Sequence, residues 1–228
     1  MKLLYICILF VIGINSANAE GGLNLKDVVD NVKEALEGRQ GSFKRQGIGA
    51  IAHVTVSERS YTVTTKNNMN SSKFERIYPE KHITLKSTSA GVFQEDHLAN
   101  TRDELSSQMA EFVEEQQFHW KVFHFDDLEN LKLAEKTLFH DCFCHQLVGK
   151  NKHGSPVIYM IDPENWLPYG QIFMPGGDPE NKIDILYMDW ETKRHFNGFR
   201  QLVIYDRDLV FNYRFGEMTT LGSDERYN

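Results

Sequence analysis

The sequence predicts an α+β protein: one large, strongly curved antiparallel β-sheet with two helices packed on one of its faces. Three observations predict this class. One segment near the N-terminus repeats apolar residues at helical spacing. Many later segments alternate apolar and polar residues, which is the period of a half-buried strand. These strand-like segments follow one another in runs instead of alternating with helices, and such runs form antiparallel sheets.

The composition is that of a globular protein, with 41% hydrophobic and 25% charged residues among 228. Residues 1–19 have the features of a secretion signal: a positive Lys2, an apolar run over residues 3–14, and the small residues Ala17 and Ala19. We therefore expect cleavage after Ala19 and a single mature domain over residues 20–228. The formal net charge of −7 excludes the basic surface that binds nucleic acid. The chain is thus predicted to be an exported monomer without a nucleic-acid partner.

The first half of the mature chain is predicted as one helix followed by four strands. Asn24 caps the helix and Gly38 ends it. Its apolar stripe consists of Leu25, Val28, Val29, Val32 and Leu36. The strands follow over residues 48–57, 61–65, 72–78 and 82–87, and clusters of turn-forming residues separate them.

The second half is predicted as one helix followed by further strands. Thr101 and Glu104 match a helix capping box, and the apolar residues between 105 and 113 continue on one face. Residues 118–125 are the most aromatic stretch of the chain, where Phe123 and Phe125 alternate as they would on a strand. Further strands are predicted over residues 137–148, 156–161, 171–174, 183–190, 201–205 and 209–215.

Two cysteines remain after the signal, Cys142 and Cys144, with only Phe143 between them. An even number of cysteines in an exported protein invites a disulfide. On a strand, however, residues i and i+2 lie about 6.6–6.8 Å apart, at the limit of what a disulfide bridges. We therefore favour two buried thiols and keep a reducible bridge as the alternative.

The same cysteines raise a second hypothesis. His140, Cys142 and Cys144 would project to one face of the predicted strand, and His145 to the other. Imidazole and thiolate are the ligands that zinc and copper prefer. Inward packing of the thiols is the simpler interpretation, so no cofactor is expected and a metal-binding or redox protein is kept as an alternative.

Other titratable groups are expected at the surface. The remaining histidines are dispersed among polar neighbours, and the acidic pairs at residues 114–115 and 126–127 are adjacent in sequence rather than facing each other. The motifs of nucleophilic, zinc-dependent and nucleotide-dependent catalysis are absent from the sequence. The sequence therefore predicts a protein that is not an enzyme.

Aromatic residues are numerous: 15 Phe, 9 Tyr and 3 Trp. They suit an ordinary core, but a concave sheet lined by large apolar groups also forms a ligand cavity. Each methylene of an acyl chain buried there contributes about 0.8 kcal/mol. The residues expected to line such a cavity are Val54, Tyr61, Phe74, Tyr78, Phe93, Phe123, Phe125, Tyr159 and Phe173.

Residues 159–173 carry a strand–turn–strand pattern in which Asp162 ends one strand and a Leu-Pro pair, with Pro168, starts the next. This pattern resembles that of LolA-like outer-membrane lipoprotein-sorting proteins, the lipoprotein carriers. Residues 139–148 are also similar to the family's preceding strand. Residues 72–79 differ from the tryptophan and Arg-Pro stretch of true lipoprotein carriers, which indicates a divergent member.

The resemblance implies an incomplete β-barrel with helices on its concave face, whose apolar cavity binds acyl chains in the periplasm. The leading hypothesis is therefore a periplasmic, non-catalytic binding or carrier protein for a lipid-like or acylated ligand, a lipoprotein included. The first alternative is an envelope protein-interaction or sensor module, which holds a partner's segment on the same sheet or at its open edge. The metal-binding or redox protein is the second.

Overall fold

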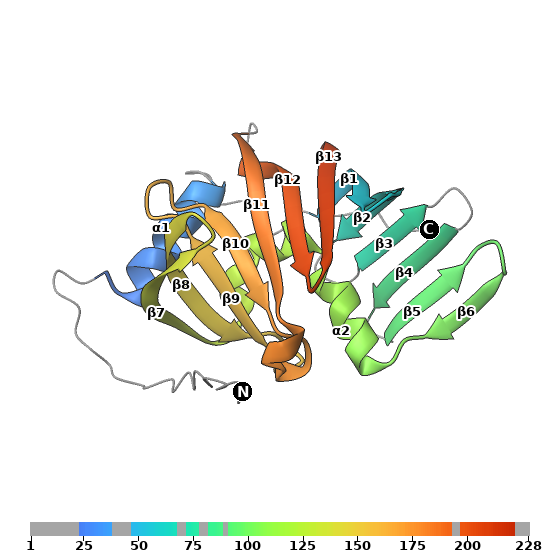
Figure 1. Cartoon of the computed structure of the whole chain (residues 1–228), viewed down its shortest axis with the longest axis horizontal. Coiled ribbons are helices and arrows are strands. Elements are labelled where there is room, and N and C mark those ends of the chain that lie inside the picture. The colour runs from blue at the N-terminus through green and yellow to red at the C-terminus, as the bar shows by residue number, and fades with distance from the viewer. Residues whose placement is uncertain are drawn as a thin grey trace, which may run out of the picture.

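The computed structural model of the chain describes residues 23–37, 47–67, 72–77, 82–88, 91–192 and 197–221. The predicted secretion signal with its cleavage site, the predicted helix end at Gly38, and Tyr78 lie outside these residues. Figure 1 shows one curved sheet with a helical segment in its hollow and a further helix at one end.

The described strands form a 13-stranded sheet in the order β6-β5-β4-β3-β2-β1-β13-β12-β11-β10-β9-β8-β7. The strands of the first half of the sheet are β1 (Gly47–Val56), β2 (Arg59–Asn67), β3 (Ser72–Ile77), β4 (His82–Thr88), β5 (Gly91–Asp96) and β6 (Thr101–Glu104). The strands of the second half are β7 (Glu129–Phe139), β8 (Cys142–Lys150), β9 (Pro156–Ile161), β10 (Pro168–Phe173), β11 (Ile183–Thr192), β12 (Asn197–Asp206) and β13 (Leu209–Leu221).

The sheet is an open barrel. Within β1–β6 and within β7–β13, each strand pairs in antiparallel fashion with the next strand of the chain, and the pairing of β1 with β13 joins the two halves in the middle of the sheet. The free edges are β6 and β7, which do not pair with each other. The prediction of an α+β protein with one large, incompletely closed antiparallel sheet is therefore confirmed.

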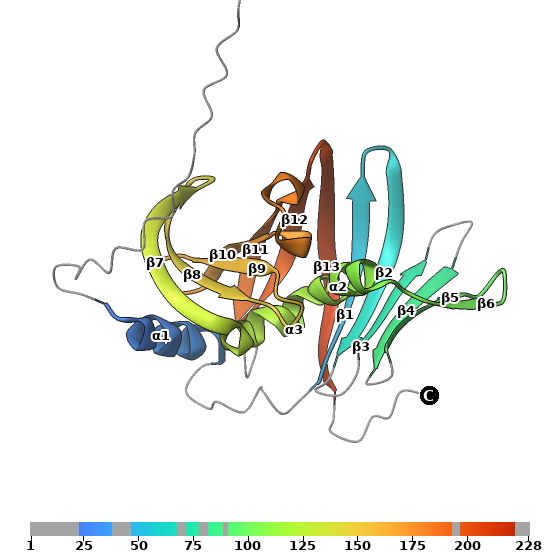
Figure 2. The ribbon, with the colours of Figure 1, turned by 90° about the horizontal axis from the view of Figure 1, so that it is seen from below.

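Helix α1 (Leu25–Glu37) forms where the sequence predicts it and buries Val28 and Val32 completely. Asn24 Oδ1 accepts a hydrogen bond from Asp27 N at 3.0 Å, and the Asp27 carboxylate accepts one from Asn24 N at 3.3 Å. These two bonds satisfy otherwise unpaired N–H groups at the helix start. The helix contacts β7 and β12, at the end of the sheet away from β6 (Figure 2).

Helices α2 (Ser107–Glu115) and α3 (Phe118–Phe123) follow one another along the concave face of the sheet (Figure 2). Helix α2 contacts β4, β5 and the turn after β10, and α3 contacts β1. Most residues from 110 to 123 are buried. The chain therefore crosses from edge β6 to edge β7 through the hollow of the sheet, and this crossing buries most of these residues.

The capping box predicted at the start of α2 is wrong. Thr101 and Glu104 belong to β6, where they pair with Asp96 and Phe93 of β5. The helix begins six residues after Thr101, at Ser107, and its N-cap is Ser106. The local capping signal is overridden because these residues complete a hairpin with β5.

The aromatic stretch over residues 118–125 is helical and not strand-like. It forms α3 and a short 3-10 turn over Phe125–Asp127. The described part of the chain therefore holds three α-helices where two were predicted. Phe123 and Phe125 both remain buried, because this segment lies against the concave face of the sheet.

The strand predicted over residues 137–148 is the hairpin of β7 and β8. His140 has a φ of 53°, which turns the chain instead of extending it. Cys142 and Cys144 form a disulfide, with 5.4 Å between their Cα atoms. The prediction of two thiols is wrong because it assumed a fully extended strand, on which this distance is larger.

Apolar clusters lie on both faces of the sheet, since successive residues of a strand point to opposite faces. The larger cluster fills the concave face and includes residues of α1, α3 and most strands. The smaller one lies on the convex face and consists of Phe139, Cys144, Met160, Ile172, Leu186 and Val203. The tip of the β7–β8 hairpin lies over this cluster, where the His140 ring is 5.2 Å from that of Tyr205.

Residues 159–173 form the predicted strand–turn–strand. Strand β9 ends at Ile161 and β10 begins at Pro168. Asp162 organises the turn, because its Oδ1 accepts a hydrogen bond from Glu164 N at 2.9 Å and its Oδ2 one from Asn165 Nδ2 at 2.7 Å. Pro168 stands at the first position of its strand, where a missing N–H is tolerated.

Candidate ligand-binding cavity

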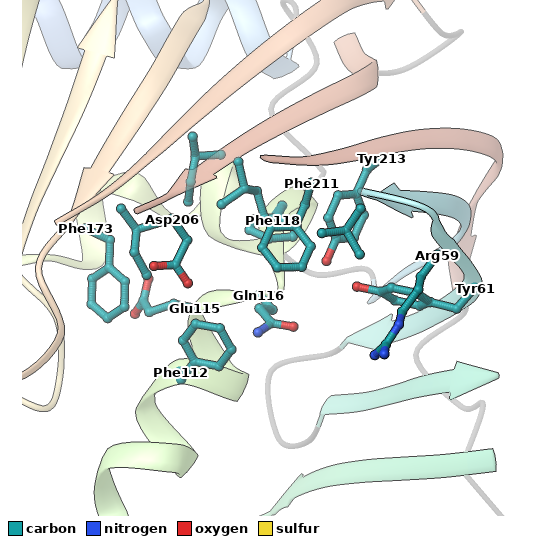
Figure 3. A pocket seen from close by; sticks show the side chains of 14 residues that line it. Arg59, Tyr61, Phe112, Glu115, Gln116, Phe118, Phe173, Asp206, Phe211 and Tyr213 are labelled. Atoms are coloured by element: carbon teal, nitrogen blue, oxygen red, sulfur yellow. The ribbon is translucent and has the colours of Figure 1, made fainter. Parts of the chain in front are cut away.

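A cavity of about 210 Å³ lies between α2 and the concave face of the sheet (Figure 3). Six aromatic residues line it: Tyr61, Phe112, Phe118, Phe173, Phe211 and Tyr213. The other lining residues are the aliphatic Val56, Ile183, Ile185 and Ile204 and the polar Arg59, Glu115, Gln116 and Asp206. The cavity is therefore mainly apolar, with few polar groups, as small-molecule sites commonly are.

The cavity has two walls. Helix α2 and the start of α3 supply one wall, with Phe112 and Phe118. The other is the concave face of β1, β2 and β10–β13, whose inward side chains alternate with outward ones. The charged Arg59 and Asp206 stand at strand ends, where β2 begins and β12 finishes. Figure 3 shows Arg59 beside Tyr61 on one side of the cavity, away from Asp206.

The residues predicted to line a cavity are distributed over several places. Tyr61 and Phe173 line the cavity from the sheet. Four others are packed in the apolar core of the concave face: Val54, Phe123, Phe125 and Tyr159.

The remaining three predicted residues lie elsewhere. Phe93 follows Val92 of the concave core and so points to the convex side of β5, where the Arg102 guanidinium is 4.4 Å from its ring centre. Phe74 belongs to β3, and its side chain, like all of Tyr78, is outside the described part of the structure.

Sequence reasoning missed the helical wall. The helical periodicity places Phe112 on an apolar face, but it does not tell whether that face meets a filled core or a cavity. Phe118 is missed because the alternation of Phe123 and Phe125 makes its segment resemble a strand. Phe211 and Tyr213 alternate on β13, and this period-2 signal was available in the sequence.

Glu115 brings a charge to the cavity wall although the residue is only 4% exposed. Its Oε1 accepts hydrogen bonds from Lys121 Nζ at 2.7 Å and from Asn151 Nδ2 at 3.1 Å. Buried carboxylates require such partners. The expectation that Glu114 and Glu115 are solvent-exposed is wrong, because α2 runs through the interior.

Glu114 fastens α2 to the surrounding strands. Its carboxylate accepts hydrogen bonds from Ser87 Oγ at 2.7 Å and from Lys152 Nζ and His153 Nε2 at 2.8 Å each. Burial raises the pKa of Glu114, but these donors outweigh burial and leave the pKa below its usual value of 4.5. One carboxylate thus ties the helix to β4 and to the β8–β9 turn.

His119 is a buried exception among the histidines, at 3% exposure. Its ring stacks on that of Phe199 at 3.9 Å between centroids, and its Nε2 lies 3.1 Å from Phe199 O. Burial lowers the pKa of His119 to about 4. The expectation of a surface position is wrong for this residue, whose neutral ring is part of the core under α3.

The structure bears on the two alternative functions. Cys142 and Cys144 are bonded to each other and so offer no thiolate to a metal. Among the described residues, no group of three or more His, Cys, Asp or Glu could hold a metal ion.

The edge strands are poor templates for a partner's strand. Strand β6 consists of four exposed, mostly charged residues, and β7 has two register shifts against β8. No helix in the described segments is long and apolar enough to span a membrane.

Solved structures share this architecture. A LolA superfamily protein from Nitrosomonas europaea superposes with a TM-score of 0.58 at 10% identity, over 88% of this chain and 94% of that one. An outer-membrane lipoprotein-sorting protein domain from Vibrio parahaemolyticus gives 0.55 at 10% identity, over 89% and 93%. A DUF1329 family protein from Desulfovibrio piger gives 0.57 at 11% identity, over 91% and 96%.

No protein-family model matches the sequence, and no curated protein matches it. The similarity therefore lies in the structure. The open antiparallel barrel with helices in its hollow is the LolA-like fold, and this chain has it. The resemblance drawn from residues 159–173 is confirmed as a likeness of fold, at 10% sequence identity.

Proposed function

We propose that this protein is a periplasmic, non-catalytic carrier or binding protein that holds an apolar, lipid-like ligand in the cavity under α2. The observation that carries the proposal is the mainly apolar cavity of about 210 Å³, with six aromatic residues on its walls. Burial of hydrocarbon against such walls contributes about 0.8 kcal/mol for each methylene. A chain of several methylenes is therefore held without any charged contact.

The size of the cavity limits the ligand. Sites for drug-sized molecules occupy roughly 300–1,000 Å³, and this cavity is smaller, at about 210 Å³. It fits one hydrocarbon chain better than the several chains of a complete lipid. The structurally similar domain from Vibrio parahaemolyticus is named as a lipoprotein-sorting protein. If the ligand of this chain is a lipoprotein, one of its acyl chains would occupy the cavity and the rest would lie outside.

Two features support an extracytoplasmic location. Residues 1–19 have the pattern of a cleaved secretion signal. The Cys142–Cys144 disulfide is of a kind that persists in oxidising compartments such as the periplasm.

The proposal is tested by native mass spectrometry of the protein recovered from its own cell envelope, together with displacement of the neutral dye N-phenyl-1-naphthylamine by long-chain probes. We expect a bound apolar molecule and dye displacement. The variant Ile204→Trp tests the location of the site: it places an indole in the cavity and should reduce dye binding at least fivefold. A wild-type protein that carries nothing and binds neither dye nor probes contradicts the proposal.

A further inference from the structure

Arg59 is the one basic residue among the described residues that line the cavity. The register of the sheet places it at the end of a row of lining residues. The paired residues of this row, from β2 across to β11, are Arg59, Val56, Phe211, Ile204 and Ile185. Residues directly opposite each other on antiparallel strands project to the same face, and the other four are apolar. The row therefore joins one cation to a continuous apolar wall.

The Arg59 guanidinium is available to a ligand. The residue is exposed, at the first position of β2. In the part of the chain that the structure describes, its guanidinium makes no hydrogen bond or ion pair. Tyr61 follows two residues later on the same face, and Figure 3 shows the two side chains next to each other at one side of the cavity. The cation thus stands where the apolar wall meets solvent.

The two acidic residues of the lining, Glu115 and Asp206, lie on the other side of the cavity (Figure 3). The charge of Glu115 is compensated, because its carboxylate is 2.7 Å from Lys121 Nζ and also accepts a hydrogen bond from Asn151. Asp206 is on β12, which is separated from β2 by three strand spacings. At about 4.8 Å each, these span about 14 Å along the sheet, more than the roughly 8 Å screening length of physiological salt. Neither carboxylate therefore cancels the charge of Arg59.

We propose that Arg59 binds an anionic head group of the ligand, a carboxylate or a phosphate, while the row from Val56 to Ile185 holds the hydrocarbon chain. A guanidinium presents its N–H donors in a planar fork that matches either kind of oxyanion. Asp206 repels such a head group from the opposite side of the cavity and so favours one orientation. This inference rests on the proposed carrier function and adds the charge and the orientation of the cargo to it.

The test compares probes that share one chain length. Displacement of N-phenyl-1-naphthylamine is measured at neutral pH with decanoate, decyl phosphate and the neutral 2-decanone. We expect the wild type to bind at least one of the two anions about fivefold more tightly than 2-decanone, the upper end for an exposed ion pair. The anion that binds more tightly distinguishes a carboxylate ligand from a phosphate ligand. In 1 M NaCl the preference for the anion should shrink, because the screening length falls to about 3 Å.

Three variants locate the preference. Arg59→Gln should abolish it and change the binding of 2-decanone less than twofold. Arg59→Lys keeps the positive charge and should retain at least half of the preference. Arg102→Gln is the matched control, because it removes one exposed guanidinium from the convex face, where that group lies over Phe93, and it should change no probe more than twofold. The urea midpoint of Arg59→Gln should equal that of the wild type, since the exposed side chain has no partner to lose.

The outcomes separate the two proposals. If no probe binds the wild type, the carrier function itself fails. If 2-decanone binds the wild type as tightly as both anions, or if Arg59→Gln weakens all three probes equally, the role of Arg59 is overturned and the carrier function stands. Tighter binding of decylammonium than of either anion also overturns it, because Asp206 would then set the charge preference.

Discussion

The ring of Phe139 lies so close to Gly170 that a Cβ atom at position 170 would approach Phe139 Cε1 to 2.5 Å. The contact fastens the tip of the β7–β8 hairpin to β10, on the convex face of the sheet. Tyr169 OH also donates a hydrogen bond to the Asp141 carboxylate, next to the hairpin turn. The tip is thus held by packing and by a polar contact, in addition to its backbone pairing.

The first prediction follows from this contact. Gly170→Ala should lower the free energy of unfolding by about 1–3 kcal/mol, because the added methyl overpacks against Phe139 and against the carbonyl of Ile185. Urea denaturation followed by tryptophan fluorescence measures it. Gly216→Ala is the control, since a Cβ there meets no atom within 4 Å. Equal effects of the two variants would contradict the described contact.

The second prediction concerns the disulfide between Cys142 and Cys144. The loop that it closes is very short, so the chain-entropy contribution is small, about 1–2 kcal/mol. Replacing both cysteines with serine should therefore lower stability by no more than that and leave dye binding within twofold. The thiol assay uses denatured mature protein, from which the expected cleavage after Ala19 has removed Cys7. It should find no reactive thiol before reduction and two after it; two thiols before reduction would show that the bond is absent.

The third prediction concerns Glu114 and acid. Its pKa is lower in the folded than in the unfolded chain, so its contribution is present above the unfolded value of 4.5 and is lost as the pH falls through the folded pKa. Glu114→Gln should cost about 1–3 kcal/mol at pH 7 because its three donors lose a charged acceptor. Below pH 4.5 the free energy of unfolding of this variant should fall less steeply with pH than that of the wild type. The exposed control Glu58→Gln should keep the wild-type pH dependence.

The fourth prediction concerns His119, in a different pH range. Its pKa is lowered by burial from 6.5 to about 4, so the unfolded chain takes up a proton first as the pH falls. The contribution of the neutral His119 to the free energy of unfolding is complete above pH 6.5 and should decline by about 3 kcal/mol down to pH 4. His119→Gln keeps a donor for Phe199 O and should flatten this slope. If His119→Gln and the exposed His53→Gln behave alike in urea titrations at pH 7, 6 and 5, the assignment fails.

Local patterns in the sequence predict the elements whose structure is decided locally. Helix α1 carries its own stripe and its own cap at Asn24, and the turn after Asp162 is built from neighbouring side chains. The prediction for residues 101–104 is wrong because a local cap signal competes with pairing to β5, which only the folded chain reveals. The prediction of one strand through His140 is wrong for a related reason, because one residue with positive φ changes a strand into a hairpin.

The cavity depends on information that one sequence does not contain. Alternation shows that Tyr61 and Tyr159 point inward, but it does not show which inward side chain meets protein and which meets open volume. The burial of Glu114 has the same character, since its partners on β4 and on the β8–β9 turn are distant in sequence. The sequence thus predicts the fold and the apolar character of the interior, and the structure is needed to separate core from cavity.

That separation gives the last prediction, which compares Phe112 with Phe125. Phe112 is half-buried and lines the cavity, whereas Phe125 is 1% exposed and belongs to the core. Phe125→Ala should destabilise by about 3–5 kcal/mol, the usual cost of removing a buried ring. Phe112→Ala should cost less than half of that, because part of its surface already faces open volume.

Ligand binding should respond in the opposite order. Phe112→Ala removes a wall and should weaken dye binding at least fivefold, while Phe125→Ala, measured well below its own unfolding transition, should alter it less than twofold. Both quantities are obtained from the same preparations, by urea denaturation and by dye titration. A variant pair in which stability and binding fall together would mean that the cavity under α2 is part of the core and is not the binding site.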